Sequence, residues 1–66
     1  MNIVLNGDPH TAREGCTLLG LLESLSIDPS RVAIELDGSI VKKEAWPATI
    51  LQSGSRVEVV MFVGGG

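Results

Sequence analysis

Residues 56–66 read RVEVVMFVGGG, and this stretch decides the fold. Its first part is a nearly continuous run of Val, Met and Phe, which suits a strand covered on both faces in the middle of a sheet. Three glycines follow directly, without a polar linker. Glycine loses the most backbone entropy on ordering and brings no side chain to pack, so residues 64–66 are expected to project as a mobile tail.

The tail has one obvious chemical use. At about 3.4 Å per residue, residues 62–66 reach roughly 17 Å, enough to enter a narrow channel in another protein. A terminal carboxylate on such a thread can be presented for chemistry inside a partner's active site. The competing interpretation is a frayed end, a proteolytic remnant or an expression scar. The residues alone leave both open, because a short glycine run is only a compositional hint.

Composition limits the class of protein. With 66 residues there is room for one small domain, and a hydrophobic fraction of 44% is typical of globular chains. Cys16 is the only cysteine, so no intramolecular disulfide forms, which fits a reducing, intracellular setting. A net charge of −3, with no basic cluster beyond Lys42-Lys43, argues against nucleic acid. The sequence has neither a bilayer-length apolar run nor a secretion signal, so we expect a cytoplasmic protein that avoids membranes.

The chain opens with a predicted hairpin. Residues 1–5 alternate as a strand with Ile3 and Leu5 on one face. Asn6-Gly7 is a strong signal for a two-residue turn, because both residues tolerate the positive φ of type I′. The return strand, residues 9–13, is expected at a sheet edge, since Pro9 cannot donate a hydrogen bond to a neighbouring strand.

One helix follows. Thr17 is a candidate N-cap, and Asp28-Pro29 is expected to end the helix because the residue before proline is steered out of the helical region. Gly20 lies inside the helix at a cost of about 1 kcal/mol relative to alanine. The apolar residues with helical spacing are Leu18, Leu19, Leu21, Leu22 and Leu25.

The second half predicts another hairpin and a final strand. Residues 32–36 and 39–41 read as strands joined by the turn Asp37-Gly38. Residues 42–47 suggest a short helical turn that Pro47 stops, and residues 49–55 a loop with positive φ at Gly54.

These elements fit one architecture. The helix must bury its leucine face, and a mixed five-stranded sheet is the economical partner. The last strand is apolar on both sides, so it belongs in the centre beside the first strand and parallel to it, with one hairpin on each side. The predicted fold is therefore an α+β, ubiquitin-like β-grasp, with the domain at residues 1–63 and the tail at residues 64–66.

A set of motifs covers essentially the whole chain in a fixed order. They are Asn6-Gly7, Asp37-Gly38-Ser39-Ile40-Val41 with a charged pair and Trp46 after it, Gly54-Ser55-Arg56-Val57-Glu58-Val59, and the terminal Val63-Gly64-Gly65-Gly66. Together they resemble the ThiS sulfur carrier family of thiamine biosynthesis. An acidic residue often stands in that family at the position of Ser55, and Asn at that of Asp37. Both departures are at turn positions with interchangeable backbone preferences.

The resemblance implies a chemical role for the tail. A partner related to ubiquitin-activating enzymes would adenylate the carboxylate of Gly66, which is then converted to a thiocarboxylate. The sulfur would pass to a thiazole synthase. ATP and Mg²⁺ would be used by the activating partner, so this chain binds no cofactor or metal and is not itself an enzyme. Gly64 and Gly65 would form the slim thread that enters the partner.

Alternation along the last strand predicts a docking surface. If Val57, Val59 and Met61 face the helix, then Val60 and Phe62 face outward, on the same side as Val4. An apolar patch just ahead of the tail is a natural docking surface for the activating enzyme. We therefore expect Val4, Val60 and Phe62 to bind the partner. The alternative is that loops of the chain itself cover this face.

Other candidate residues have simpler interpretations. Cys16 is expected to be a small buried hydrophobe, although a thiol at a helix start would be reactive if exposed. His10 is expected at the surface of an edge strand, because it matches no familiar metal-ligand spacing. Trp46 is expected to cap one end of the core. Lys42-Lys43 is expected to be solvated, with steering of a partner as the alternative.

The residues leave three other functions open. The chain could carry sulfur for a molybdopterin-type pathway, although those carriers are usually longer. It could be a ubiquitin-like modifier that forms isopeptide bonds with lysines. It could also be a β-grasp interaction domain with an inert tail.

Overall fold

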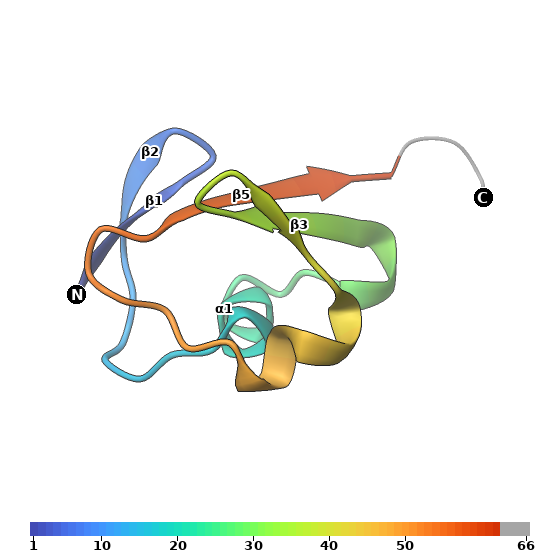
Figure 1. Cartoon of the computed structure of the whole chain (residues 1–66), viewed down its shortest axis with the longest axis horizontal. Coiled ribbons are helices and arrows are strands. Elements are labelled where there is room, and N and C mark those ends of the chain that lie inside the picture. The colour runs from blue at the N-terminus through green and yellow to red at the C-terminus, as the bar shows by residue number, and fades with distance from the viewer. Residues whose placement is uncertain (63–66) are drawn as a thin grey trace.

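The computed structural model describes residues 1–62, so the predicted domain end at residue 63 and the tail at residues 64–66 lie outside the described residues. Within residues 1–62 the sheet forms one layer, and α1 with the 3₁₀ helix η2 forms the other (Figure 1). The elements in chain order are β1 (Asn2–Leu5), β2 (Asp8–Thr11), α1 (Leu18–Ser24), the 3₁₀ helix η1 (Pro29–Arg31), β3 (Val32–Leu36), β4 (Ser39–Val41), η2 (Lys43–Ala48) and β5 (Arg56–Met61).

The sheet has the strand order β2-β1-β5-β3-β4. β1 and β5 run parallel in the middle, and the antiparallel hairpins β1–β2 and β3–β4 flank them. β5 also pairs with β3 in antiparallel fashion. This topology confirms the predicted β-grasp, including the edge position of β2 with Pro9. β2 nevertheless begins at Asp8, one residue earlier than expected.

Both hairpin turns have the backbone that their sequences predict. Asn6 and Gly7 have φ values of 48° and 85°, and Asp37 and Gly38 have 51° and 88°. Positive φ at both central residues is the type I′ geometry, whose twist matches that of the flanking strands. Gly54 also has the expected positive φ, at 86°.

The two turns do more than reverse the chain. The Oδ1 atom of Asn6 accepts a hydrogen bond of 2.8 Å from the N–H of Val59, and the Oδ1 atom of Asp37 accepts one of 2.9 Å from the N–H of Arg56. The side chain of one residue in each turn therefore anchors the central strand β5, Asn6 from the β1–β2 hairpin and Asp37 from the β3–β4 hairpin. The sequence had indicated only turn formation at these positions.

We expect Asn6→Ala to lower the free energy of unfolding by about 1–3 kcal/mol. The substitution removes the side-chain oxygen that accepts the hydrogen bond from the Val59 N–H, and alanine tolerates a positive φ less well than asparagine. Asn6→Asp is the matched control, because aspartate keeps the side-chain oxygen acceptor and tolerates a positive φ, as Asp37 does in the other turn. Urea unfolding followed by circular dichroism measures the difference. Equal midpoints for the Ala and Asp variants would show that this anchor contributes nothing.

The helix begins as predicted but ends earlier. Thr17 is the N-cap, and its Oγ1 atom accepts a 3.0 Å hydrogen bond from the N–H of Gly20. α1 ends at Ser24, and Ser26 follows with a φ of 57°. The N–H groups of Ser26 and Ile27 bond back to the carbonyls of Glu23 and Leu22, which is a Schellman motif. The prediction that Asp28-Pro29 ends the helix is therefore wrong.

Asp28 instead starts the next element. Its Oδ1 atom accepts a 2.9 Å hydrogen bond from the N–H of Ser30, and Pro29 is the first residue of η1. The Ser30 N–H lowers the pKa of the Asp28 carboxyl, because it stabilises the charged form. η1 leads directly into β3, so this turn sets where the third strand begins.

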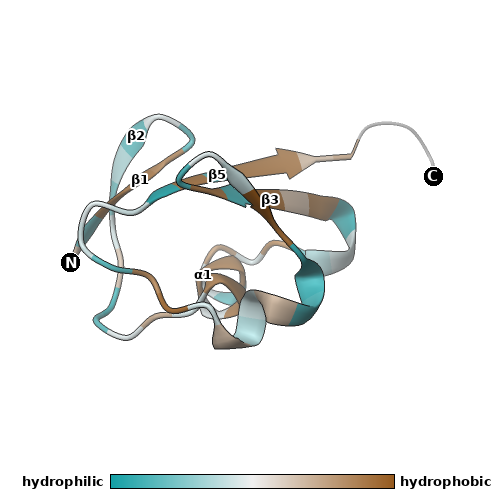
Figure 2. Cartoon of the chain, viewed as in Figure 1, coloured by the Kyte–Doolittle hydropathy of each residue, from teal (hydrophilic) through white to brown (hydrophobic). Residues whose placement is uncertain are grey.

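The core lies between the sheet and the helices. Trp46 is its largest buried side chain, and its Nε1–H donates to the carbonyl of Val41 at 2.9 Å. This confirms that Trp46 closes one end of the core, although η2 continues past Pro47 to Ala48. Most of α1 and β5 has the brown colour of hydrophobic residues in Figure 2. The buried residues are Ile3, Leu18, Leu21, Leu22, Val32, Ile34, Trp46, Leu51 and Val57.

Candidate functional site

The candidate site is the end of β5 from which the glycine tail continues. The N–H of Phe62 donates to the carbonyl of Arg31 at 2.9 Å, so η1 holds the last described residue in place. Gly64, Gly65 and Gly66 carry the predicted chemistry and lie outside the described residues. The described part of the site is therefore the base of the tail and the sheet surface beside it.

β5 extends beyond its parallel neighbour. β1 pairs only with Arg56 and Val57, whereas β3 pairs with β5 from Val57 to Met61. Val57 is buried and Val59 is half-buried, as alternation predicts, but Met61 is 58% exposed. Met61 lies opposite buried Val32 and so shares the helix-facing side of β5, but it is exposed because β1 does not pair with this end of the strand.

The outward face of β5 is open to solvent among the described residues. Val60 is 51% exposed and Phe62 is 62% exposed, so loops of the described chain do not cover them. Ala33 lies directly opposite Val60 on β3. Val4 is half-buried and lies beside Arg56, four residues earlier along β5, which is roughly 13 Å at about 3.3 Å per residue. The structure thus brings Val60 and Phe62 together and leaves Val4 at the far end of the same face.

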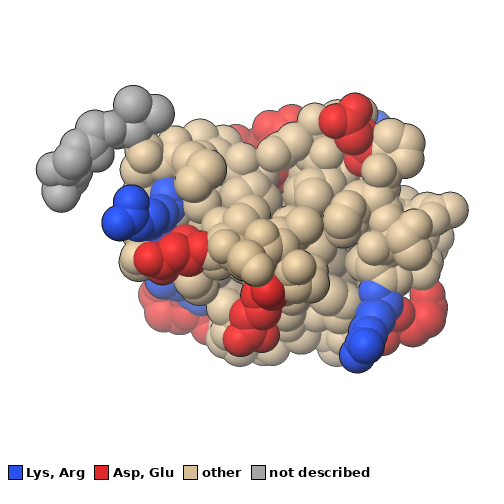
Figure 3. Space-filling model, turned by 180° about the vertical axis from the view of Figure 1, so that it is seen from behind, with Lys and Arg blue, Asp and Glu red and all other residues tan. Residues whose placement is uncertain are grey.

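A cation lies near the base of the tail. The side chain of Arg31 is 75% exposed and pairs with Asp28 at 3.6 Å, while the Arg31 carbonyl holds Phe62. Sequence reasoning missed Arg31, because nothing in the pattern linked residue 31 to residue 62. On the side of the molecule seen in Figure 3, the basic side chains lie apart from one another around a broad uncharged surface.

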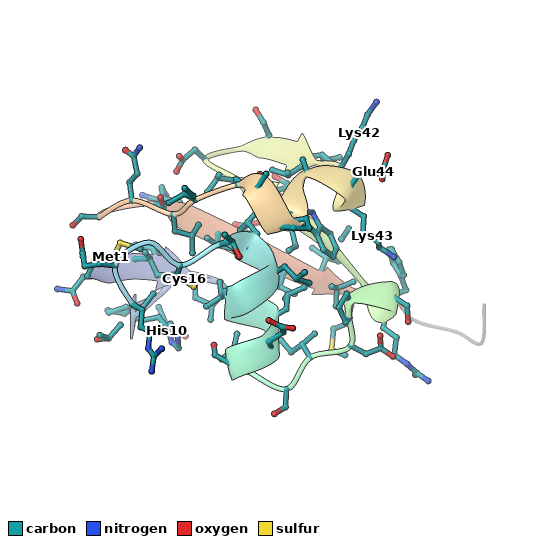
Figure 4. All side chains as sticks on the ribbon, turned by 90° about the horizontal axis from the view of Figure 1, so that it is seen from below. Met1, His10, Cys16, Lys42, Lys43 and Glu44 are labelled. Atoms are coloured by element: carbon teal, nitrogen blue, oxygen red, sulfur yellow. The ribbon has the colours of Figure 1, made fainter. Side chains whose placement is uncertain are left out.

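Cys16 lies in a different part of the molecule. It is half-buried, packs against the core and donates its Sγ–H to the carbonyl of Thr17 at 3.3 Å. It also lines an open cleft of about 460 Å³ between residues 10–17 and α1. His10 lines the same cleft, at the end of the molecule where Figure 4 shows Met1, His10 and Cys16.

The other candidates lie away from this cleft. Lys42, Lys43 and Glu44 are at the opposite end of the molecule (Figure 4), and Lys43 Nζ lies 5.8 Å from the centre of the Trp46 ring. Within residues 1–62 no group of three or more His, Cys, Asp or Glu side chains is placed to hold a metal ion. No helix in the same part of the chain is both long and apolar enough to cross a membrane.

Comparison with known families gives a match along nearly the whole chain. The model of the ThiS family matches residues 3–66, which includes the three terminal glycines. A crystal structure of the thiamine biosynthesis protein ThiS from Geobacter metallireducens is 36% identical, with full coverage of both chains and a TM-score of 0.87. A solution structure of a thiamine biosynthesis protein from the same organism gives a TM-score of 0.83 and covers all of this chain and 88% of that one.

Similar curated proteins include much longer chains. The thiazole synthase of Magnetococcus marinus is 46% identical over 66 residues, and that of Paramagnetospirillum magneticum is 33% identical. This chain spans only about a fifth of the length of each, at 20% coverage. An uncharacterized protein, ycf40, of Porphyra purpurea is 30% identical, and the match covers 93% of its length.

Proposed function

This chain belongs to the ThiS family of sulfur carriers in thiamine biosynthesis, and we propose that it carries sulfur as a thiocarboxylate on Gly66. The observation that carries the proposal is the extent of the family match, which runs to residue 66 and so includes the glycine tail. In the proposed cycle a partner related to ubiquitin-activating enzymes adenylates Gly66. Sulfur then replaces AMP, and the thiocarboxylate delivers it to a thiazole synthase.

The chemistry explains why a partner is needed. A free carboxylate is a poor acceptor for sulfur, because its oxygen is a poor leaving group. When a carboxylate oxygen attacks the α-phosphorus of ATP and pyrophosphate leaves, the acyl group gains AMP as a leaving group. The partner binds ATP and Mg²⁺ for this step, and the chain contributes only substrate atoms. The glycines keep the thread as narrow as the backbone, so that the partner can close around it.

Thiazole synthase is the proposed receiver of the sulfur. Two proteins of that name contain a segment similar to the whole of this chain, within a polypeptide about five times as long. A carrier-like segment and a synthase on one polypeptide are expected to work together.

The outward face of β5 is the proposed docking surface for the activating enzyme. Exposed Val60 and Phe62 lie just ahead of the tail, and Val4 extends the same face toward the other end of the sheet. Exposed apolar side chains next to a reactive segment favour docking by burial of apolar surface. Contact there would fix the direction in which the tail enters the partner.

Phe62→Asp is therefore expected to weaken the activating enzyme's apparent affinity by about 10- to 100-fold, since it places a charge where an apolar contact forms. Pyrophosphate release at varied carrier concentration measures the change. The matched control is Ile50→Asp, at a residue exposed to 60% in the loop before β5. If both variants match the wild type in KM, the docking surface lies elsewhere.

Intact-mass spectrometry of the protein from its native cell tests the function itself. A gain of about 16 Da, the replacement of one oxygen by sulfur, marks the thiocarboxylate. High-mass conjugates would indicate a ubiquitin-like modifier instead. A protein with neither change under thiamine starvation would contradict the carrier proposal and favour a plain interaction domain.

A further inference from the structure

Two glutamates face each other on the open side of the sheet. Glu35 on β3 lies directly opposite Glu58 on β5. The Phe62 N–H donates to the Arg31 carbonyl, and the Asp37 N–H donates to the Arg56 carbonyl. Hydrogen-bonded pairs alternate along an antiparallel ladder, so Glu35 and Glu58, which lie between these two pairs, also form a hydrogen-bonded pair. Alternation from buried Val57 turns Glu58 outward, and Glu35 shares its face.

No cation of the described chain neutralises this pair. The ion pairs among residues 1–62 are Met1 with Glu14 and Arg31 with Asp28, so neither Glu35 nor Glu58 has an ionic partner there. Arg56 lies on the same face, two residues before Glu58 and beside Val4, and makes no ion pair with either glutamate in the described structure. Like charges directly opposite on neighbouring strands destabilise a sheet. The fold alone therefore gives no reason to place two carboxylates here.

The surroundings of the pair indicate what would cover it. On this face the next pair toward the tail is Ala33 with Val60, and Ile40 on β4, which is 76% exposed, lies opposite Glu35. The acidic pair is thus bordered by apolar side chains toward the tail and toward β4, with Arg56 on the side away from the tail. A partner surface that fits must be apolar with a cation at its centre, because burying two unpaired carboxylates would oppose binding.

We propose that Glu35 and Glu58 together bind one arginine of the thiazole synthase during sulfur delivery, an inference that rests on the proposed function. A planar guanidinium presents five N–H donors and can donate to both carboxylates at once, which a single lysine does less well. The synthase is the chosen partner because two thiazole synthases carry a segment like this chain in the same polypeptide, which keeps carrier and synthase surfaces within reach of each other.

The test compares two double variants that remove the same charge. Glu35→Gln/Glu58→Gln removes the pair, and Glu23→Gln/Glu44→Gln removes two exposed carboxylates from α1 and η2 on the other layer. Binding to the purified thiazole synthase is measured by calorimetry at low and high salt. We expect the first variant to bind about tenfold more weakly with a smaller salt dependence, and the control to bind within about twofold of wild type.

Two further readouts separate this inference from the proposed function. Removing the repulsion should raise the Tm of the isolated carrier by about 1–5 °C, so weaker binding cannot be attributed to unfolding. At saturating carrier the rate of thiocarboxylate formation by the activating enzyme should stay within about twofold, because the pair lies on the face that docks this enzyme but takes no part in the adenylation step. Equal binding by the two double variants would overturn this inference alone, and a specific loss of adenylation would assign the pair to the activating enzyme and overturn it too. Failure of wild type to gain sulfur would instead contradict the proposed function.

Discussion

A chain that lacks Gly66 is expected to form the acyl-adenylate at least about 100-fold more slowly than the full-length chain. Deletion moves the terminal carboxyl carbon by about 3.4 Å along the thread, and displacement of a reacting atom by about 1 Å can already cost two orders of magnitude. The proposed docking residues Val60 and Phe62 remain in place, so binding should change far less than the rate. Single-turnover adenylation with saturating enzyme, ATP and Mg²⁺ measures the loss.

Two controls show whether the loss comes from the position of the carboxylate. Addition of one alanine after Gly66 displaces the carboxylate in the other direction and should be about as damaging. Both variants should unfold at the same urea concentration as the wild type, since the changes lie beyond Phe62, whose hydrogen bond to Arg31 is the last described contact of the strand. Adenylation of either variant at the wild-type rate would contradict the assignment of Gly66.

The second large effect concerns stability. Trp46→Ala is expected to lower the free energy of unfolding by about 3–5 kcal/mol, because it leaves a cavity where the largest buried side chain lies. A 66-residue domain without a disulfide has a total stability of only a few kcal/mol, so most of the variant should be unfolded at 25 °C. Circular dichroism and urea titration measure the folded fraction.

Trp46→Phe separates packing from hydrogen bonding. It keeps an aromatic ring but leaves the carbonyl of Val41 without the indole donor, at a cost of about 1–3 kcal/mol for the lost bond and volume. This variant should fold, and the alanine variant should not. A fully folded Trp46→Ala protein would show that α1 and the sheet are held together without this residue.

Several features of the fold were predictable because the local preference of the residues and the burial of their side chains favour the same structure. The apolar run in β5 predicted a central strand, and β5 does lie between the two hairpins, but the expectation that both of its faces are covered is wrong, because the helices pack on one face only. Asn6-Gly7 and Asp37-Gly38 required positive φ, which fixed the register of each hairpin. Trp46 has a large apolar side chain, so the apolar surface that it would otherwise expose to water was enough to predict its burial.

Other features depend on contacts between residues far apart in sequence. The side chain of Asn6 bonds to Val59, and the carbonyl of Arg31 to Phe62, and neither residue type reveals its partner. Ser26, just after the C-cap of the helix, has a positive φ, a conformation for which glycine is the usual signal. Met61 faces the helix layer, as alternation predicts, but lies beyond the end of β1, so strand length decided its exposure.

The position of the sulfur tests the central claim most directly. The chain is incubated with the activating enzyme, ATP, Mg²⁺ and a sulfur donor, and the C-terminal peptide and the Cys16 peptide are compared by tandem mass spectrometry. The account predicts a gain of about 16 Da confined to Gly66, from exchange of one oxygen for sulfur. A gain of about 32 Da on Cys16, the mark of a persulfide, with an unchanged Gly66 would contradict it.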